Sequence, residues 1–157
     1  MKTQKRRRME GKTDYQARFN LLKSGNSRFV VRKTNRYIIV QIAESEIAQD
    51  KIIARASSKE LLEKGWPKEK EGSLKSLQAA YLTGFLLAKK VSKIIKHAVL
   101  DSGINRNIHG SRIYAALNGA LGGGLKIPHS DDALPSEERL KENTNLFKLM
   151  QSIKEKM

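Results

Sequence analysis

The sequence of 157 residues contains no cysteine, which excludes disulfides, thiolate metal sites and a thiol nucleophile and favours a cytosolic protein. It also lacks a long hydrophobic run. The longest, residues 79–88, is interrupted by Thr83 and Gly84 and falls far short of the roughly 20 residues that a membrane span needs. The first residues are cationic with no apolar stretch behind them, so no secretory signal is expected.

Acidic residues are scarce relative to basic ones. The chain has 16 Asp and Glu against 31 Lys and Arg, and the formal net charge is +15. Like charges repel across a compact domain, and a polyanion relieves that repulsion. Phosphate backbones do so and release counterions as they bind. The charge therefore favours a nucleic-acid partner over a surface tuned for solubility, and over a membrane surface, for which no lipidation motif is present.

The length and the hydrophobic fraction of 39% are those of a single domain with short extensions. Residues 1–12 are predicted to form a basic arm that orders only on a partner, because their cations cannot build a core. Residues 13–135 are predicted to form one α/β RNA-binding domain, and residues 136–157 a C-terminal amphipathic helix.

Hydrophobic periodicity predicts the elements of this domain. A helix should begin with a capping box at Thr13 and Gln16 and bury a stripe that includes Phe19. Strands are expected at 28–33, 36–43, 51–56 and 97–101, with a tight turn at Thr34 and Asn35. Further helices are expected at 57–62, 73–96 and 111–121, the last capped by Ser111 and ended by three glycines at 122–124. Ser136 should cap the final helix. This order predicts an α/β fold with a mixed sheet of about four strands.

Basic residues gather in three segments that could bind phosphates: the arm, the predicted hairpin at 32–36, and the loop at 105–112 before a helix. The candidate RNA-binding residues are Lys2, Lys5, Arg6, Arg7, Arg8, Lys12, Tyr15, Arg18, Arg28, Arg32, Lys33, Asn35, Arg36, Arg106, His109 and Arg112. Tyr15 could stack on a base or lie in the core. Arg28, Arg32, Arg36 and Arg55 alternate with apolar residues, which predicts a sheet with one dry and one partly cationic face.

Two other functions fit a basic chain. A magnesium-dependent nuclease would need paired carboxylates, and Asp101 at a strand end is the best single candidate, although a turn aspartate is the simpler interpretation. A generic nucleic-acid chaperone would bind DNA and RNA alike. No cofactor or metal ligand set is indicated, because the three histidines are dispersed and there is no cysteine.

Several short segments, in order, resemble a known family. They include residues 15–18, 21–25, 28–38, 79–84, 98–101, and 109–112 through 124–129. The chain resembles the universal large-subunit ribosomal protein family that binds 5S ribosomal RNA, number eighteen in the universal naming, in its archaeal and eukaryotic form. Asn118, where a lysine is expected, and Gly122 and Gly123, in place of a more polar pair, depart from the family pattern.

The resemblance implies a non-enzymatic, cytoplasmic ribosomal protein without a cofactor. Its partners would be 5S rRNA, the large-subunit rRNA and neighbouring large-subunit proteins, with no membrane and no small-molecule substrate. It would help anchor 5S rRNA in the central protuberance. The arm, the hairpin and the 106–112 loop correspond to the family's RNA-facing segments.

Overall fold

The computed structural model describes residues 3–46 and 49–157, and the candidate Lys2 lies outside them. The strands are β1 (Arg28–Lys33), β2 (Ile38–Glu46), β3 (Gln49–Ser57) and β4 (Val99–Asp101). The α-helices are α1 (Arg6–Met9), α2 (Tyr15–Lys23), α3 (Leu77–Val91), α4 (Arg112–Gly122), α5 (Glu137–Lys141) and α6 (Thr144–Glu155). Short 3₁₀ helices are η1 (Ser58–Leu62), η2 (Lys68–Ser73) and η3 (Asp131–Ala133).

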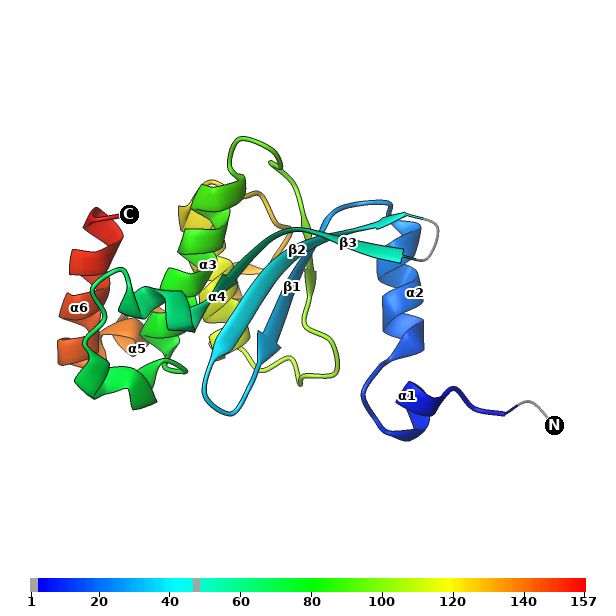
Figure 1. Cartoon of the computed structure of the whole chain (residues 1–157), viewed down its shortest axis with the longest axis horizontal. Coiled ribbons are helices and arrows are strands. Elements are labelled where there is room, and N and C mark those ends of the chain that lie inside the picture. Colours follow the sequence, from blue (N-terminus) through cyan, green and yellow to red (C-terminus); the bar gives the residue numbers. More distant parts are fainter. Residues whose placement is uncertain (1–2, 47–48) are drawn as a thin grey trace.

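The four strands form one mixed sheet in the order β3-β2-β1-β4 (Figure 1). The pairs β1–β2 and β2–β3 are antiparallel, and β4 joins β1 in parallel. A parallel neighbour requires a crossover, which the chain makes through α3. The predicted α/β class and four-stranded mixed sheet are confirmed.

Helices α3 and α4 cover one face of the sheet. Phe29 and Val31 of β1 point into this core because alternate residues of a strand face opposite sides. Two glycines let the helices approach closely: a Cβ at Gly84 would overlap the Ala116 carbonyl, and one at Gly119 would overlap the Tyr81 carbonyl. The core between sheet and helices therefore depends on these glycines.

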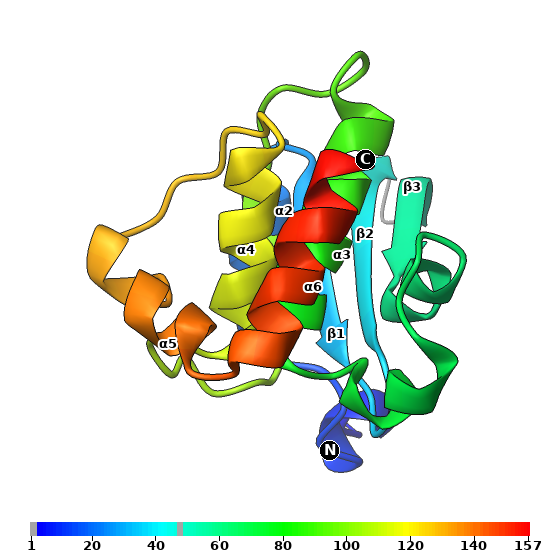
Figure 2. The same ribbon diagram turned by 90° about the vertical axis from the view of Figure 1, so that its left-hand side faces the viewer.

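A second apolar cluster lies beyond α3. Trp66, Leu61 and Leu74 pack there against Met150 and Ile153 of α6. Figures 1 and 2 show α5 and α6 at one end of the molecule and the N-terminal segment with α2 at the other. In the part of the chain that the structure describes, no helix is both long and apolar enough to span a membrane.

Helix α2 differs from its prediction. None of its residues is buried, and Phe19, expected in the core, is 54% exposed. Its N-cap is Asp14 rather than Thr13, because the Asp14 carboxylate accepts hydrogen bonds from the Gln16 and Ala17 amides. Thr13 instead accepts a hydrogen bond from Arg7 Nε.

Other boundaries also differ from the prediction. The helix predicted at 73–96 is shorter, since Ser76 caps α3 and the chain leaves the helix after Val91. The hairpin loop is longer, because β2 begins at Ile38. Ser111 is the N-cap of α4, but its hydroxyl makes no capping hydrogen bond.

The C-terminal region holds two helices where one was predicted. Ser136 caps α5 as expected, and Asn143 then caps a separate α6. The three glycines end α4 as predicted, with Gly124 in the left-handed region at φ 95°.

Candidate nucleic-acid interface

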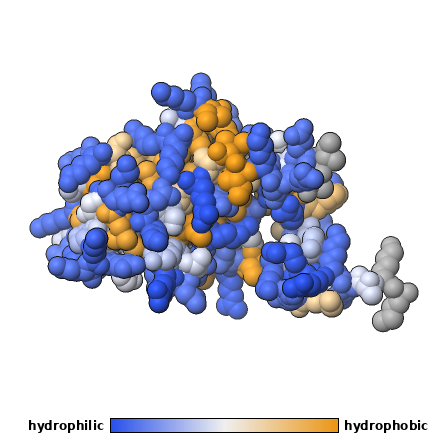
Figure 3. Space-filling view, in the orientation of Figure 1, coloured by the Kyte–Doolittle hydropathy of each residue, from blue (hydrophilic) through white to orange (hydrophobic). Residues whose placement is uncertain are grey.

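The candidate interface lies at the end of the sheet where β1, β4 and α2 meet. A cavity of about 790 Å³ opens there, lined by the segment before α2, α2 itself, the end of β1, β4 and the loop at 102–105. Its cationic lining residues are Arg7, Lys12, Arg18, Arg32 and Lys33, and its acidic ones are Asp14 and Asp101. Two of the three predicted basic segments thus meet at one cavity. Hydrophilic residues dominate this end of the molecule on the face seen in Figure 3, at the right.

The arm presents its cations to solvent. Lys5, Arg6, Arg7, Arg8 and Lys12 are all exposed. One turn of helix, α1, carries the three arginines, and Arg6 pairs with Glu10 at 2.7 Å. Lys5 Nζ lies 4.6 Å from the centre of the Tyr15 ring, a cation–π distance. Tyr15 is therefore half-buried beneath the arm and does not belong to the main core.

The β1–β2 hairpin presents a second cationic group. Lys33, Asn35 and Arg36 are exposed around the loop, which is closed by a hydrogen bond from the Thr34 amide to the Tyr37 carbonyl. Arg32 points to the face of the sheet opposite Phe29 and Val31, as strand alternation requires. This face is the one expected to be partly cationic.

The third segment follows β4. Arg106, His109 and Arg112 are exposed, but the cavity lining ends at Asn105, so these three residues lie beyond it. Gly103, at φ 63°, lets the loop turn back toward the sheet, and a Cβ there would lie 3.0 Å from the Arg32 guanidinium. The structure therefore brings the start of this loop, but not its predicted RNA-binding residues, to the cavity.

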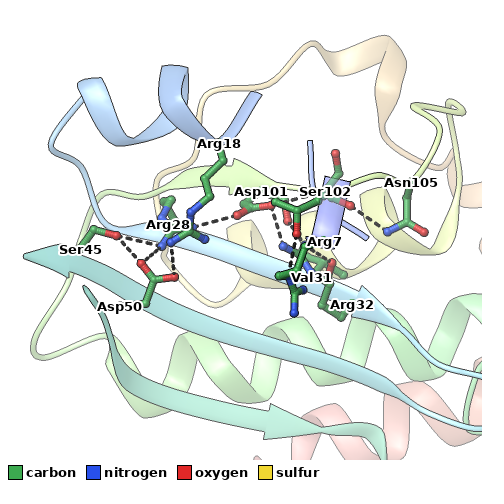
Figure 4. Close-up of polar contacts among 12 residues, drawn as sticks. Arg7, Arg18, Arg28, Val31, Arg32, Ser45, Asp50, Asp101, Ser102 and Asn105 are labelled. Carbon is green, nitrogen blue, oxygen red and sulfur yellow. Dashed lines mark hydrogen bonds and ion pairs between the residues drawn. The ribbon is translucent and has the colours of Figure 1, made fainter. Parts of the chain in front are cut away.

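Beside the cavity, five residues form a chain of ion pairs with alternating charge (Figure 4). Arg18 NH2 lies 2.9 Å from Asp50 Oδ2, and Arg28 NH2 lies 2.6 Å from Asp50 Oδ1. Arg28 NH1 lies 3.0 Å from Asp101 Oδ2, and Arg32 NH2 lies 2.9 Å from Asp101 Oδ1. We call these residues the charge chain. It joins α2, β3, β1 and β4.

The charge chain corrects the prediction for Arg28 and agrees with the simpler interpretation of Asp101. The Arg28 side chain is only 2% exposed and binds two carboxylates, so it is removed from the candidate RNA contacts. Asp101 is 7% exposed and paired with Arg28 and Arg32, and it also accepts a hydrogen bond from the Gly103 amide. Its oxygens are therefore engaged by the protein itself, which is the structural role of a strand-end aspartate and not that of a metal ligand.

Asp50 is ionised throughout the physiological range. Burial raises the pKa of its carboxyl, but hydrogen bonds from Ser45, Arg18 and Arg28 outweigh that effect and lower the pKa to about 2. Its charge is therefore available to hold both arginines at any pH at which the protein functions.

Sequence reasoning missed the polar residues that complete the cavity. Ser102 and Asn105 line it, and the Asn105 side-chain amide donates a 2.7 Å hydrogen bond to the Ser102 carbonyl. It also missed Asp50 as the partner of Arg18 and Arg28. No local pattern identifies these residues, because the parallel pairing of β4 with β1 brings Ser102 and Asn105 to the cavity, and the antiparallel pairings of β2 with β1 and β3 bring Asp50 to Arg28.

Known proteins resemble this chain over most of its length. The family model described as "Ribosomal large subunit proteins 60S L5, and 50S L18" matches residues 1–98 and 95–130. The chain is 47% identical over 138 residues to the large ribosomal subunit protein uL18 of Aeropyrum pernix, covering 87% of this chain and 63% of that protein. It is 51% identical over 137 residues to uL18 of Korarchaeum cryptofilum, covering 87% and 68%.

The uL18 of Methanococcus maripaludis matches 96% of this chain at 43% identity. The chain thus spans between about three-fifths and three-quarters of the length of these curated relatives. The family match extends across the arm, the sheet and the loop that form the cavity. The chain belongs to the uL18 family of large-subunit ribosomal proteins, a structural and non-enzymatic family.

Proposed function

We propose that this chain is a structural constituent of the large ribosomal subunit that binds 5S rRNA and helps anchor it to the large rRNA in the central protuberance. The observation that carries the proposal is the gathering of cations from the arm, α2 and the hairpin around one cavity. The remaining RNA contacts would come from Lys5, Arg6, Arg8, Asn35, Arg36 and the exposed residues Arg106, His109 and Arg112.

The mechanism follows from the chemistry of these side chains. A folded RNA presents phosphates, 2′-hydroxyls and shape more readily than base edges. Exposed arginines and lysines bind phosphates and position the RNA, while Asn35 and Tyr15 can contact sugars or bases. Recognition would therefore rest on the shape of a helix junction, with neighbouring large-subunit proteins completing the assembly.

A competition assay tests the proposal. Labelled 5S rRNA bound to the full chain is challenged with excess transfer RNA and duplex DNA at about 150 mM salt, where non-specific contacts weaken. We expect 5S rRNA to remain bound. Displacement of labelled 5S rRNA by transfer RNA or duplex DNA as readily as by unlabelled 5S rRNA would instead indicate the generic nucleic-acid chaperone.

The arm is tested by replacing Arg6, Arg7 and Arg8 with alanine. We expect weaker 5S rRNA binding and a salt dependence flatter by about 0.7–0.9 slope units for each phosphate that the variant no longer binds. The matched control replaces Lys64, Lys68 and Lys70 with alanine. These lysines are exposed in the region before α3, and their replacement removes the same amount of charge. A slope that changes equally in both variants would assign the effect to net charge rather than to the arm.

A further inference from the structure

The charge chain is buried in the middle and open at its ends. Arg28 is 2% exposed, whereas the terminal members Arg18 and Arg32 are 34% and 42% exposed. Both terminal arginines line the cavity, but they come from different elements, α2 and β1. The charge chain thus connects two partly open guanidinium groups through the protein interior.

Stability alone gives a weak reason for such an arrangement. Burying charges costs desolvation energy, and well-packed apolar residues usually stabilise a core at least as well as a buried ion pair does. What the charge chain does supply is orientation. Each terminal arginine is held on one side by a carboxylate, which restricts the directions that its guanidinium group can take.

The terminal arginines keep donors for a further partner. Among the described residues, Arg18 uses only NH2, which donates to Asp50. Arg32 uses NH1 for the Val31 and Asp101 carbonyls and NH2 for the Asp101 carboxylate. A guanidinium has five N–H donors in a rigid fork. Each side chain therefore retains N–H groups, and Arg7, Lys12 and Lys33 add positive charge around the same cavity.

We propose that the charge chain is an orienting device, in which Asp50 and Asp101 hold Arg18 and Arg32 so that their remaining donors bind RNA backbone phosphates at the cavity. This inference rests on the proposed function and specifies how one part of that surface recognises RNA. Arg18 and Arg32 are the contacts, and Asp50, Arg28 and Asp101 are positioning residues. Fixing the arginines before binding reduces the conformational entropy that binding must remove.

The proposal and general electrostatics predict opposite signs for one substitution. Asp50→Asn removes a negative charge, so electrostatics alone predicts tighter binding to a polyanion. The orienting role predicts weaker binding, because Arg18 loses its ionic partner. We expect about fivefold weaker 5S rRNA binding at about 150 mM salt, which corresponds to the net contribution of one typical hydrogen bond.

The matched control is Glu155→Gln, which makes the same charge change at an exposed position of α6, at the opposite end of the molecule (Figure 1). We expect its binding to be equal to or slightly tighter than that of the wild type. Asp50→Asn binding as tightly as Glu155→Gln would overturn the orienting role while leaving the proposed function intact. A wild-type chain with no preference for 5S rRNA would overturn both.

A double-mutant cycle shows whether Asp50 acts through Arg18. In the Arg18→Ala background, Asp50→Asn should have no further effect on binding. An undiminished fivefold loss there would contradict the proposal. Thermal unfolding of each variant establishes that the comparison is made between folded proteins.

A second variant keeps the test decisive if Asp50→Asn does not fold. Arg18→Lys preserves the charge but removes the rigid fork that can bind a carboxylate and a phosphate together. We expect a loss of about threefold or more, against no change for Arg55→Lys, an exposed arginine of β3 that does not line the cavity. Equal binding by the two variants would overturn the proposal.

Inorganic phosphate would offer the cavity the same chemistry as an RNA backbone phosphate. Competition between inorganic phosphate and 5S rRNA distinguishes these two ligands. If the cavity binds successive backbone phosphates, excess inorganic phosphate at constant ionic strength should not displace 5S rRNA from the wild type. Binding of inorganic phosphate to the wild type but not to Arg18→Ala, together with equal binding of 5S rRNA by the two proteins, would assign the cavity to a free anion and contradict the proposal.

Discussion

The end of the molecule built on α3 and α4 is held by apolar packing, whereas the end built on α2 is held by ion pairs. Helix α3 is buried along most of its length, and glycines bring its backbone against α4. Helix α2 buries no residue, and the Arg18–Asp50 ion pair links it to the β2–β3 hairpin. The first end therefore holds most of the apolar packing of the fold, and the second gathers cations around the cavity.

Among the substitutions that test this comparison, Gly119→Ala should cause the largest loss in the free energy of unfolding. The added Cβ would overlap the Tyr81 carbonyl, and backbone cannot move aside as a flexible side chain can. We expect a loss of about 3 kcal/mol in the free energy of unfolding, at the upper end of typical overpacking costs. Urea denaturation measures this, with Gly72→Ala as control, because a Cβ at Gly72 meets no atom within 4 Å. Equal stability of the two variants would show that the helix contact is not tight.

Acid should destabilise the end of the molecule built on α2 before it destabilises the end built on α3 and α4. The depressed pKa of Asp50 means that its ion pairs stabilise the fold above about pH 4 and that this contribution is lost as the pH falls toward 2. Because the carboxylate is 32% exposed, solvent screens it, and we expect on the order of 1 kcal/mol. The stability difference between wild type and Asp50→Asn, measured by denaturation at several pH values, should therefore shrink below pH 4. A difference that is constant from pH 7 to pH 2 would contradict this assignment.

Phe19→Ala should have the smallest effect. Its ring is exposed on α2 and contacts the Lys23 ammonium at 4.7 Å. We expect a change within about 0.5 kcal/mol, as for surface substitutions generally. Thermal unfolding measures this, and a loss of several kcal/mol would show that α2 packs against a core after all.

The sequence predicted the parts of the fold that rest on periodic apolar residues. The four strands, the two core helices and the glycine stop after α4 all follow from local patterns. The error at Phe19 has a physical cause. An apolar stripe on a helix indicates an amphipathic face, but only tertiary packing determines whether anything covers that face.

The candidate site was less predictable than the fold. Charge counting identified Arg18 and Arg32, and both line the cavity. It also selected Arg28, whose exposure cannot be inferred from its residue type. Its partners Asp50 and Asp101 lie 22 and 73 residues away along the chain, so no local pattern connects them to it.

These long separations along the chain also determine when the contacts of Arg28 can form during synthesis and folding. The Arg28–Asp50 contact needs the β2–β3 hairpin, and the Arg28–Asp101 contact needs β4, which pairs only after the intervening helix has crossed over. A partly synthesised or partly folded chain therefore has the basic arm without the complete charge chain. Such a chain would attract RNA loosely, and secure binding would begin only when the last strand joins the sheet.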